Sequence, residues 1–98
     1  MAVSTIKLTG VRIKSCHFDD LAQYTNGPYY LTIATGLKSK AGIPSNATII
    51  AVNIRGWAGL ETVVNVGLYS TDGLYVFYSY GTTISSDSYI TVQIAYIV

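Results

Sequence analysis

The sequence predicts an all-β, single-domain protein, an antiparallel β-sandwich or jelly-roll-like fold of about six to seven strands. Three observations favour this class. Apolar and polar residues alternate with the period of two that strands show, turn-forming residues recur about every 8 to 12 positions, and no segment has the period of a helix. A chain of 98 residues has the usual size of one domain and cannot supply a second core. We therefore expect residues 1–98 to form one sandwich domain.

The first half of the chain is the less regular half. Residues 4–18 are rich in β-forming side chains and are interrupted by Gly10, which fits one long bent strand or two short ones. Residues 19–26 indicate a loop or at most one helical turn, and the Gly-Pro pair that follows opens a strand over 29–35. Residues 37–46 contain Gly, Lys, Ser and Pro, and we expect a loop there.

The second half of the chain alternates almost without interruption. It predicts strands over residues 48–57, 61–70, 74–80 and 88–98. The residues expected on the core side are Ile50, Val52, Ile54, Val64, Val66, Leu68, Tyr78, Tyr80, Ile90, Val92, Ile94, Tyr96 and Val98. Thr71-Asp72-Gly73 predicts a tight hairpin turn, because Asp and Gly tolerate left-handed backbone. The last strand runs to the C-terminus, which we expect to be held in a sheet.

The composition disfavours several classes of partner. Charged residues make up 11% of the chain, against about 25% in typical soluble domains. Such a low charge fits a surface partly covered by copies of the same chain, or an ordinary exterior of Ser, Thr and Tyr. The six basic residues are scattered, so we expect no nucleic-acid partner. No apolar run is long enough for a membrane span, and no signal peptide is apparent, which predicts synthesis in the cytoplasm without secretion.

The residues that carry most enzyme chemistry are scarce. Cys16 is the only cysteine and therefore has no intramolecular disulfide partner. His17 adjoins it, but neighbouring side chains on a strand point to opposite faces, which separates a thiol from its base. Asp19 and Asp20 follow without the ligand spacing of zinc or calcium sites. We predict no enzymatic activity, no metal and no cofactor.

The aromatic residues are the unusual feature of the chain. Nine Tyr and one Trp exceed what so small a core holds. The candidates for contact with a ligand or a subunit are Trp57, Tyr69, Tyr75, Tyr89 and Tyr29. Exposed Tyr and Trp rings suit protein interfaces and sugar faces equally. The alternatives are that the tyrosines only stabilise cross-strand pairs, and that Trp57 closes the end of the core.

Two stretches, residues 42–50 (GIPSNATII) and 90–98 (ITVQIAYIV), together with Trp57 between them, resemble the C-terminal domains of bacteriophage tail fibres and related minor structural proteins. The resemblance covers about the last 60 residues. It implies a trimeric, virion-associated tip that adsorbs to glycan or protein on a host surface, and it supplies no fixed binding residue. The long shaft of whole fibres is missing, which leaves open a fragment, a short fibre or an accessory protein.

Two other functions remain open from the sequence. One is a free-standing carbohydrate-binding or adhesin module, and the other is a purely structural capsid or tail decoration domain. The oligomeric state separates the tail-fibre tip, expected to be a homotrimer, from the free-standing module, expected to be a monomer. A symmetric oligomer that binds neither glycans nor host cells would indicate the structural role.

Overall fold

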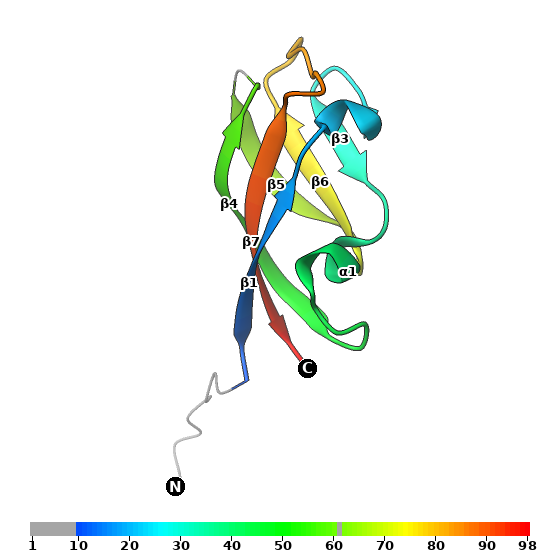
Figure 1. Ribbon diagram of the computed structural model, residues 1–98, viewed down its shortest axis with the longest axis vertical. Coiled ribbons are helices and arrows are strands. Elements are labelled where there is room, and N and C mark those ends of the chain that lie inside the picture. The colour runs from blue at the N-terminus through cyan, green and yellow to red at the C-terminus, as the bar shows by residue number, and fades with distance from the viewer. Residues whose placement is uncertain (1–9, 61) are drawn as a thin grey trace, which may run out of the picture.

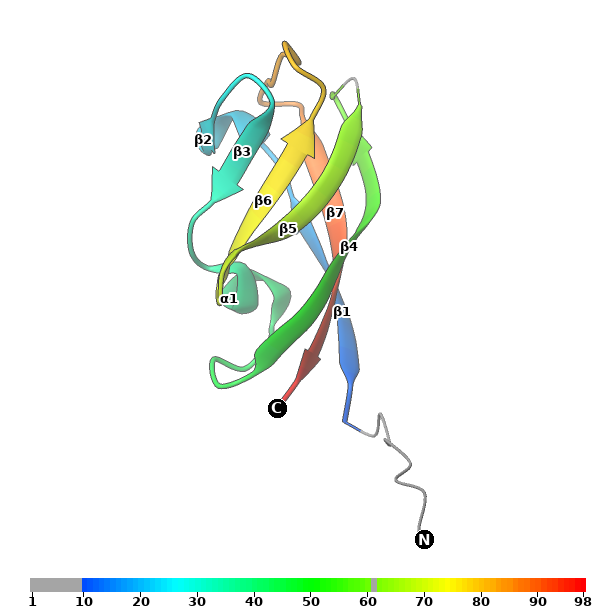
Figure 2. The same ribbon diagram turned by 180° about the vertical axis from the view of Figure 1, so that it is seen from behind.

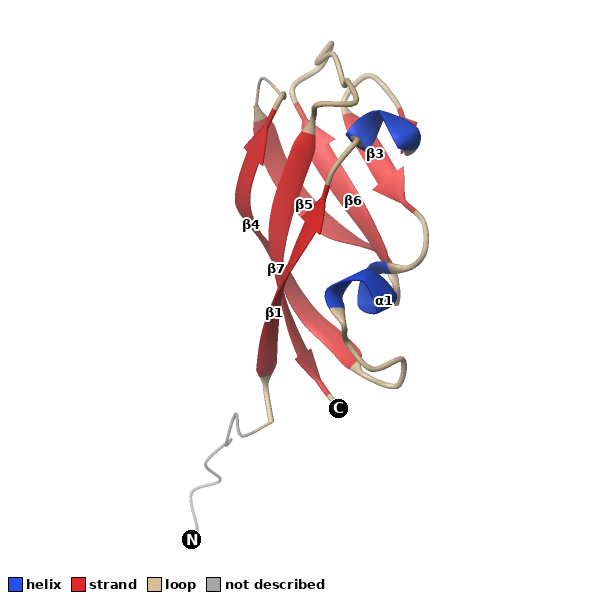
Figure 3. Ribbon diagram, viewed as in Figure 1, coloured by secondary structure: helices blue, strands red, loops and turns tan. Residues whose placement is uncertain are grey.

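The computed structural model describes residues 10–60 and 62–98, and it confirms the predicted sandwich of two antiparallel sheets (Figure 1). One sheet has three strands in the order β1-β7-β4, and the other has four in the order β2-β3-β6-β5. The strands are β1 (Arg12–Phe18), β2 (Thr25–Asn26), β3 (Tyr30–Ile33), β4 (Thr48–Ala58), β5 (Val63–Ser70), β6 (Gly73–Tyr78) and β7 (Tyr89–Ile97). Two short helices, η1 (Leu21–Gln23) and α1 (Leu37–Ala41), lie between strands (Figure 3).

The strand pairing joins distant parts of the chain. The first described strand, β1, pairs with the last, β7, and β3 pairs with β6, which also forms a hairpin with β5. Strands β4 and β5 follow each other in the chain but belong to different sheets, so each forms one edge on the same side of the sandwich (Figure 2). On the opposite side, α1 packs against β1. Within residues 10–60 and 62–98, the α-helix therefore lies on the side of the sandwich formed by β1.

Strand β7 confirms the predicted core strand. It lies between β1 and β4, and its alternate residues Ile90, Val92, Ile94 and Tyr96 are all buried. Val98 follows the end of β7 and is exposed, so its predicted core position is wrong.

Two bulges change the predicted faces of β4. The pairing of β4 with β7 shifts between Ile49 and Ala51, which makes Ile50 the extra residue. Ile49 is therefore buried, while Ile50 is 49% exposed, and the prediction of Ile50 in the core is wrong. Val52 and Ile54 keep their predicted core side and are partly buried against the core.

Strand β5 differs from the prediction for the same reason. Its pairing with β6 shifts between Val63 and Asn65, so Val63 is buried and Val64 is 65% exposed. Val66 lies in the core as predicted. Leu68 pairs with Leu74 but is 40% exposed, so its predicted core position is also wrong.

Helix α1 replaces part of the loop predicted over residues 37–46. It has only five residues, too few to show a helical period in the sequence. Gly36 and Gly42, both with positive φ, bound it, and its first residue, Leu37, is fully buried. The Asp72 carboxylate accepts hydrogen bonds from the backbone N–H of Gly36 at 3.0 Å and of Lys38 at 2.7 Å. The turn of the β5–β6 hairpin therefore fixes the start of this helix.

Several loops gather at the end of the sandwich opposite α1 (Figure 1). Ser88 bonds to two of the neighbouring loops. Its buried hydroxyl donates to the carbonyl of Gly59 at 2.6 Å, and its own carbonyl accepts the N–H of Leu21 at 3.0 Å. Gly59 has φ 70°, and a Cβ there would lie 2.9 Å from the Ser88 Cα, so no other residue fits. Three loops distant in the sequence are thus held at one point.

The remaining predictions are close to the structure. Residues 19–26 were predicted to form a loop or at most one helical turn, and they contain the single turn η1. Strand β2 in this segment was not expected. The strand predicted over 29–35 is shorter than expected and corresponds to β3. Tyr80 lies beyond the end of β6 and is 80% exposed, so its predicted core position is wrong. Residues 4–9 of the first predicted strand lie outside the described residues. Across the described ranges, no helix has the length and apolar character that crossing a membrane requires.

Candidate functional site: an aromatic strip on the four-stranded sheet

The outer face of the four-stranded sheet carries a continuous row of aromatic rings. We call these residues the aromatic strip: Tyr29, Tyr30, Tyr69, Tyr75 and Phe77. The strip results from the alternation of outward and inward side chains along β6. Tyr75 and Phe77 point outward, while Leu74, Val76 and Tyr78 are buried in the core. This face is the one turned toward the reader in Figure 2.

The rings of the aromatic strip contact one another in sequence across three strands. Tyr29 lies 4.9 Å from Tyr30 between ring centroids, and Tyr30 lies 5.9 Å from Tyr75. Tyr75 stacks on Phe77 at 5.4 Å and meets the edge of Tyr69 at 5.0 Å. Aromatic pairs at such distances stabilise a structure by about 0.5–1.5 kcal/mol each beyond the area they bury. The rings therefore form one mutually supported surface.

The backbone beneath the strip determines how the rings lie. Gly67 on β5 is the cross-strand partner of Tyr75, and a Cβ at Gly67 would come within 4.0 Å of the Phe77 ring. The absence of a side chain at Gly67 leaves room for the rings over β5. At the other end, the Tyr78 hydroxyl lies 2.7 Å from the carbonyl oxygens of both Gly27 and Tyr30. The segment that carries the first two rings is thus anchored to the core.

Four rings of the strip enclose a shallow hollow of about 360 Å³. It is lined by Tyr29, Tyr30, Tyr75 and Phe77, and no charged residue of the described ranges lines it. Aromatic rings offer an apolar surface for C–H groups, and the Tyr hydroxyls donate and accept hydrogen bonds at its margin. A ligand that combines an apolar face with hydroxyl groups fits this chemistry.

The structure brings three of the five predicted contact residues together. Tyr29, Tyr69 and Tyr75 all belong to the aromatic strip. Tyr30 and Phe77 were not among the predicted contact residues, although Phe77 has the same strand parity as Tyr75 and was detectable on that ground.

Trp57 and Tyr89 lie on the other sheet, away from the strip. Trp57 on β4 pairs with Ile90 and is 40% exposed, at the edge of the sandwich. Tyr89 packs against the ring of His17 at 4.9 Å on the outer face of the three-stranded sheet. These two predicted contact residues therefore do not contribute to the aromatic strip.

The structure separates Cys16 from His17. Cys16 is buried and His17 is exposed, with His17 Nδ1 2.9 Å from the Thr91 hydroxyl oxygen. Burial raises the pKa of the Cys16 thiol, against a smaller opposing effect of Lys40, so the thiol stays protonated near neutral pH. In residues 10–60 and 62–98, no three His, Cys, Asp or Glu side chains gather closely enough to hold a metal ion.

Comparison of the chain with protein-family models, with curated proteins and with solved structures finds no match.

Proposed function

We propose that this protein is a non-enzymatic receptor-binding domain of the kind carried at the tips of phage tail fibres, and that it binds carbohydrate on a host surface through the aromatic strip. The observation that carries the proposal is the uncharged hollow between Tyr29, Tyr30, Tyr75 and Phe77. Sugars present C–H faces that stack on aromatic rings and hydroxyl groups that bond to the Tyr hydroxyls. The lack of charged lining residues favours a neutral sugar.

The outermost rings of the strip support a binding role over a purely structural one. Aromatic residues that stabilise a sheet do so mainly as regular cross-strand pairs. Tyr29 precedes β3, and Tyr69 is the extra residue of a bulge in β5, so neither belongs to a regular ladder pair, although Tyr69 still contacts Tyr75 at 5.0 Å. Both are about half exposed, at 50% and 46%. Their positions extend the aromatic surface beyond what strand pairing requires.

The proposed domain acts as part of a virion and assembles as a homotrimer, as the tail-fibre resemblance implies. A free-standing carbohydrate-binding module is the second candidate, because the same strip serves a monomer equally well. A structural decoration domain is the third, and in that case the strip is covered by a neighbouring subunit instead of a sugar.

The decisive experiment is the binding of the fluorescently labelled domain to an array of oligosaccharides. Tyr75→Ala removes the ring at the middle of the strip and is expected to weaken binding at least about tenfold, which is about 1.4 kcal/mol. Tyr75→Phe keeps the ring and should retain most of the binding. Tyr80→Ala is the matched control, because Tyr80 is highly exposed and lies outside the strip.

Two outcomes contradict the proposal. One is an array on which no oligosaccharide binds the folded domain. The other is a Tyr75→Ala variant that binds as tightly as Tyr80→Ala.

A further inference from the structure

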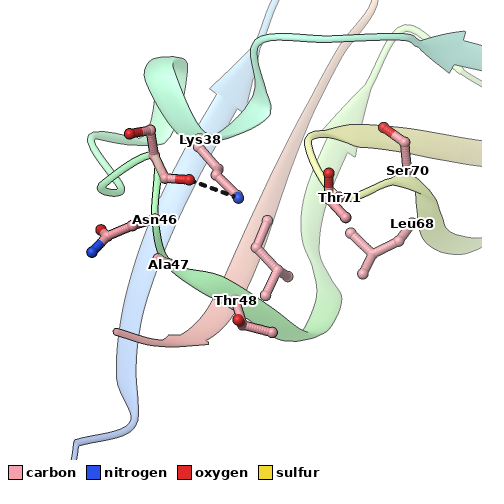
Figure 4. A pocket seen from close by; sticks show the side chains of 9 residues that line it. Lys38, Asn46, Ala47, Thr48, Leu68, Ser70 and Thr71 are labelled. Atoms are coloured by element: carbon pink, nitrogen blue, oxygen red, sulfur yellow. Dashed lines mark hydrogen bonds between the residues drawn. The ribbon is translucent and has the colours of Figure 1, made fainter.

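A second cavity lies at the end of the sandwich that contains α1, and it shares no residue with the aromatic strip. This cleft of about 480 Å³ opens between the start of β4, the end of β5 and the loop after α1 (Figure 4). Its apolar lining comes from Ala47, Ile49 and Leu68. Its polar lining consists of Lys38, Ser45, Asn46, Thr48, Ser70 and Thr71. We call it the Lys38 cleft.

Lys38 supplies the charge of this cleft. Its ammonium donates a hydrogen bond to the Ser45 carbonyl at 3.2 Å, which directs the side chain across the cleft toward the loop after α1 (Figure 4). An ammonium has three N–H donors, so two remain for a ligand. Lys38 is the one charged residue that lines the cleft within the described part of the chain.

The carboxylate of Asp72 bonds to the backbone outside this cleft. Asp72 lines a neighbouring hollow of about 320 Å³, on which Lys38 also borders. Both of its carboxylate oxygens accept backbone N–H groups, one from Gly36 and one from Lys38. Asp72 does not line the Lys38 cleft, so Lys38 supplies the side-chain charge among the described residues that line it.

The donors and walls of the cleft match one class of ligand. The Lys38 ammonium is a compact positive charge, which suits a single carboxylate. The hydroxyls of Thr48, Ser70 and Thr71 and the Asn46 amide suit the hydroxyl groups of a sugar. The apolar wall suits the C–H face of a sugar ring, a contact that a bare inorganic anion does not use. The volume lies within the range of about 300–1,000 Å³ that is usual for small-molecule sites.

We propose that the Lys38 cleft binds a carboxylate-bearing monosaccharide unit of the uronic-acid type. This site is distinct from the aromatic strip in both place and chemistry, since the strip lacks charge and the cleft contains an ammonium. The proposal does not rest on the proposed function, because it requires none of the five rings.

The test is a titration of the ¹⁵N-labelled chain with glucuronate, followed by amide chemical shifts. We expect shifts concentrated at residues 45–49 and 68–71, and a dissociation constant that rises at least about fivefold in Lys38→Gln. Lys40→Gln is the matched control, because it removes the same charge from the same helix but from outside the cleft. Leu68→Trp, which fills the cleft and keeps Lys38, should also abolish binding.

Comparison ligands and one strip variant make the result decisive. Glucose should bind several-fold more weakly than glucuronate because it lacks the carboxylate, and acetate should do so because it lacks the ring. Equal binding of glucuronate and either comparison ligand overturns the proposal, as does an equal loss in Lys38→Gln and Lys40→Gln. Tyr75→Ala should leave glucuronate binding unchanged, and loss of binding in that variant would place the sugar on the aromatic strip instead.

Discussion

Tyr78 connects the hydrophobic core to the segment that carries the aromatic strip. Its ring is almost fully buried, while its hydroxyl bonds to the backbone of residues on either side of Tyr29. Burial raises the pKa of Tyr78 above its ordinary value of about 10. Burial likewise raises the pKa of Tyr24, with a smaller contribution from the Asp19 carboxylate. Both phenols therefore remain neutral in the folded chain at a pH that ionises them in the unfolded chain.

This difference predicts a loss of stability in alkali. Below about pH 10 the two phenols are protonated in both the folded and the unfolded chain, so the fold keeps its full stability. Above that pH the phenols of the unfolded chain ionise first, which lowers the free energy of unfolding. We expect the urea midpoint of the wild type to fall between pH 8 and pH 10.5, and to fall less in Tyr78→Phe. An identical pH dependence in the two proteins would exclude Tyr78 as a source of the effect.

Asp72 fixes the start of α1 from a different part of the chain. Asp72→Asn leaves one acceptor oxygen for two backbone N–H donors, and we expect it to destabilise the fold by about 1–2 kcal/mol. Asp87→Asn is the control, because the Asp87 side chain is exposed in the β6–β7 loop. Urea unfolding of both variants measures the difference. Equal stabilities would show that the carboxylate contributes little to holding the helix.

The sequence allowed the turn at Asp72 to be predicted but not its contact with α1. The turn depends on the local preferences of Asp and Gly, whereas the contact joins residues 34 or more positions apart.

The tyrosines likewise divide into those whose burial the local pattern predicted and those for which it failed. Strand parity placed Tyr78 and Tyr96 in the core correctly, and it failed for Tyr80 because β6 ends at Tyr78. Parity predicts the face of a residue only as far as its strand continues.

At the scale of elements, unbroken strands were predictable and bulged strands were not. Strand β7 has the predicted register over its whole length. Strands β4 and β5 each have two register shifts. A bulge depends on which residues of the partner strand are available, and an isolated strand pattern does not contain that information. The outward position of Tyr75 was therefore predictable, because Tyr75 lies on the regular strand β6. Tyr69 was also named from the sequence, but it reaches the strip as the extra residue of a bulge that the pattern did not indicate.

The central position of β7 predicts a sharp difference between neighbouring residues. Val92→Asp and Ile94→Asp should each abolish soluble folding, because each places an unpaired charge in the core. Gln93→Asp, on the outer face of the same strand, should fold. Circular dichroism of the purified soluble fractions checks this, and a folded Val92→Asp variant of near wild-type stability would contradict the register of β7.

At the scale of the whole molecule, the edge strands β4 and β5 form the surface that we expect a second subunit to use. Ile50, Trp57 and Val64 are exposed on these two edge strands, while α1 covers the opposite side. The formal net charge is only +1, so copies of the chain repel one another weakly. This surface supports the proposed assembly of the domain with itself.

Light scattering over a range of concentrations tests the proposed homotrimer. We expect a mass of three chains that does not change on dilution, and partial dissociation in Ile50→Ser and Val64→Ser. Ile13→Ser is the control, because Ile13 is equally exposed but lies on the outer face of the three-stranded sheet. A wild type that is monomeric at every concentration would favour the free-standing module.

The bulges in β4 and β5 also affect how readily these two edge strands pair with another chain. An edge strand offers unpaired N–H and C=O groups to any passing chain, and many proteins deter this with charged side chains. This chain has few charges to place there, but two of its edge strands, β4 and β5, each change register twice. An incoming regular strand is therefore able to form only a few consecutive main-chain hydrogen bonds before its donors and acceptors no longer lie opposite those of the bulged strand. On these two strands, irregular geometry thus limits edge-to-edge pairing as charged side chains do on other edge strands.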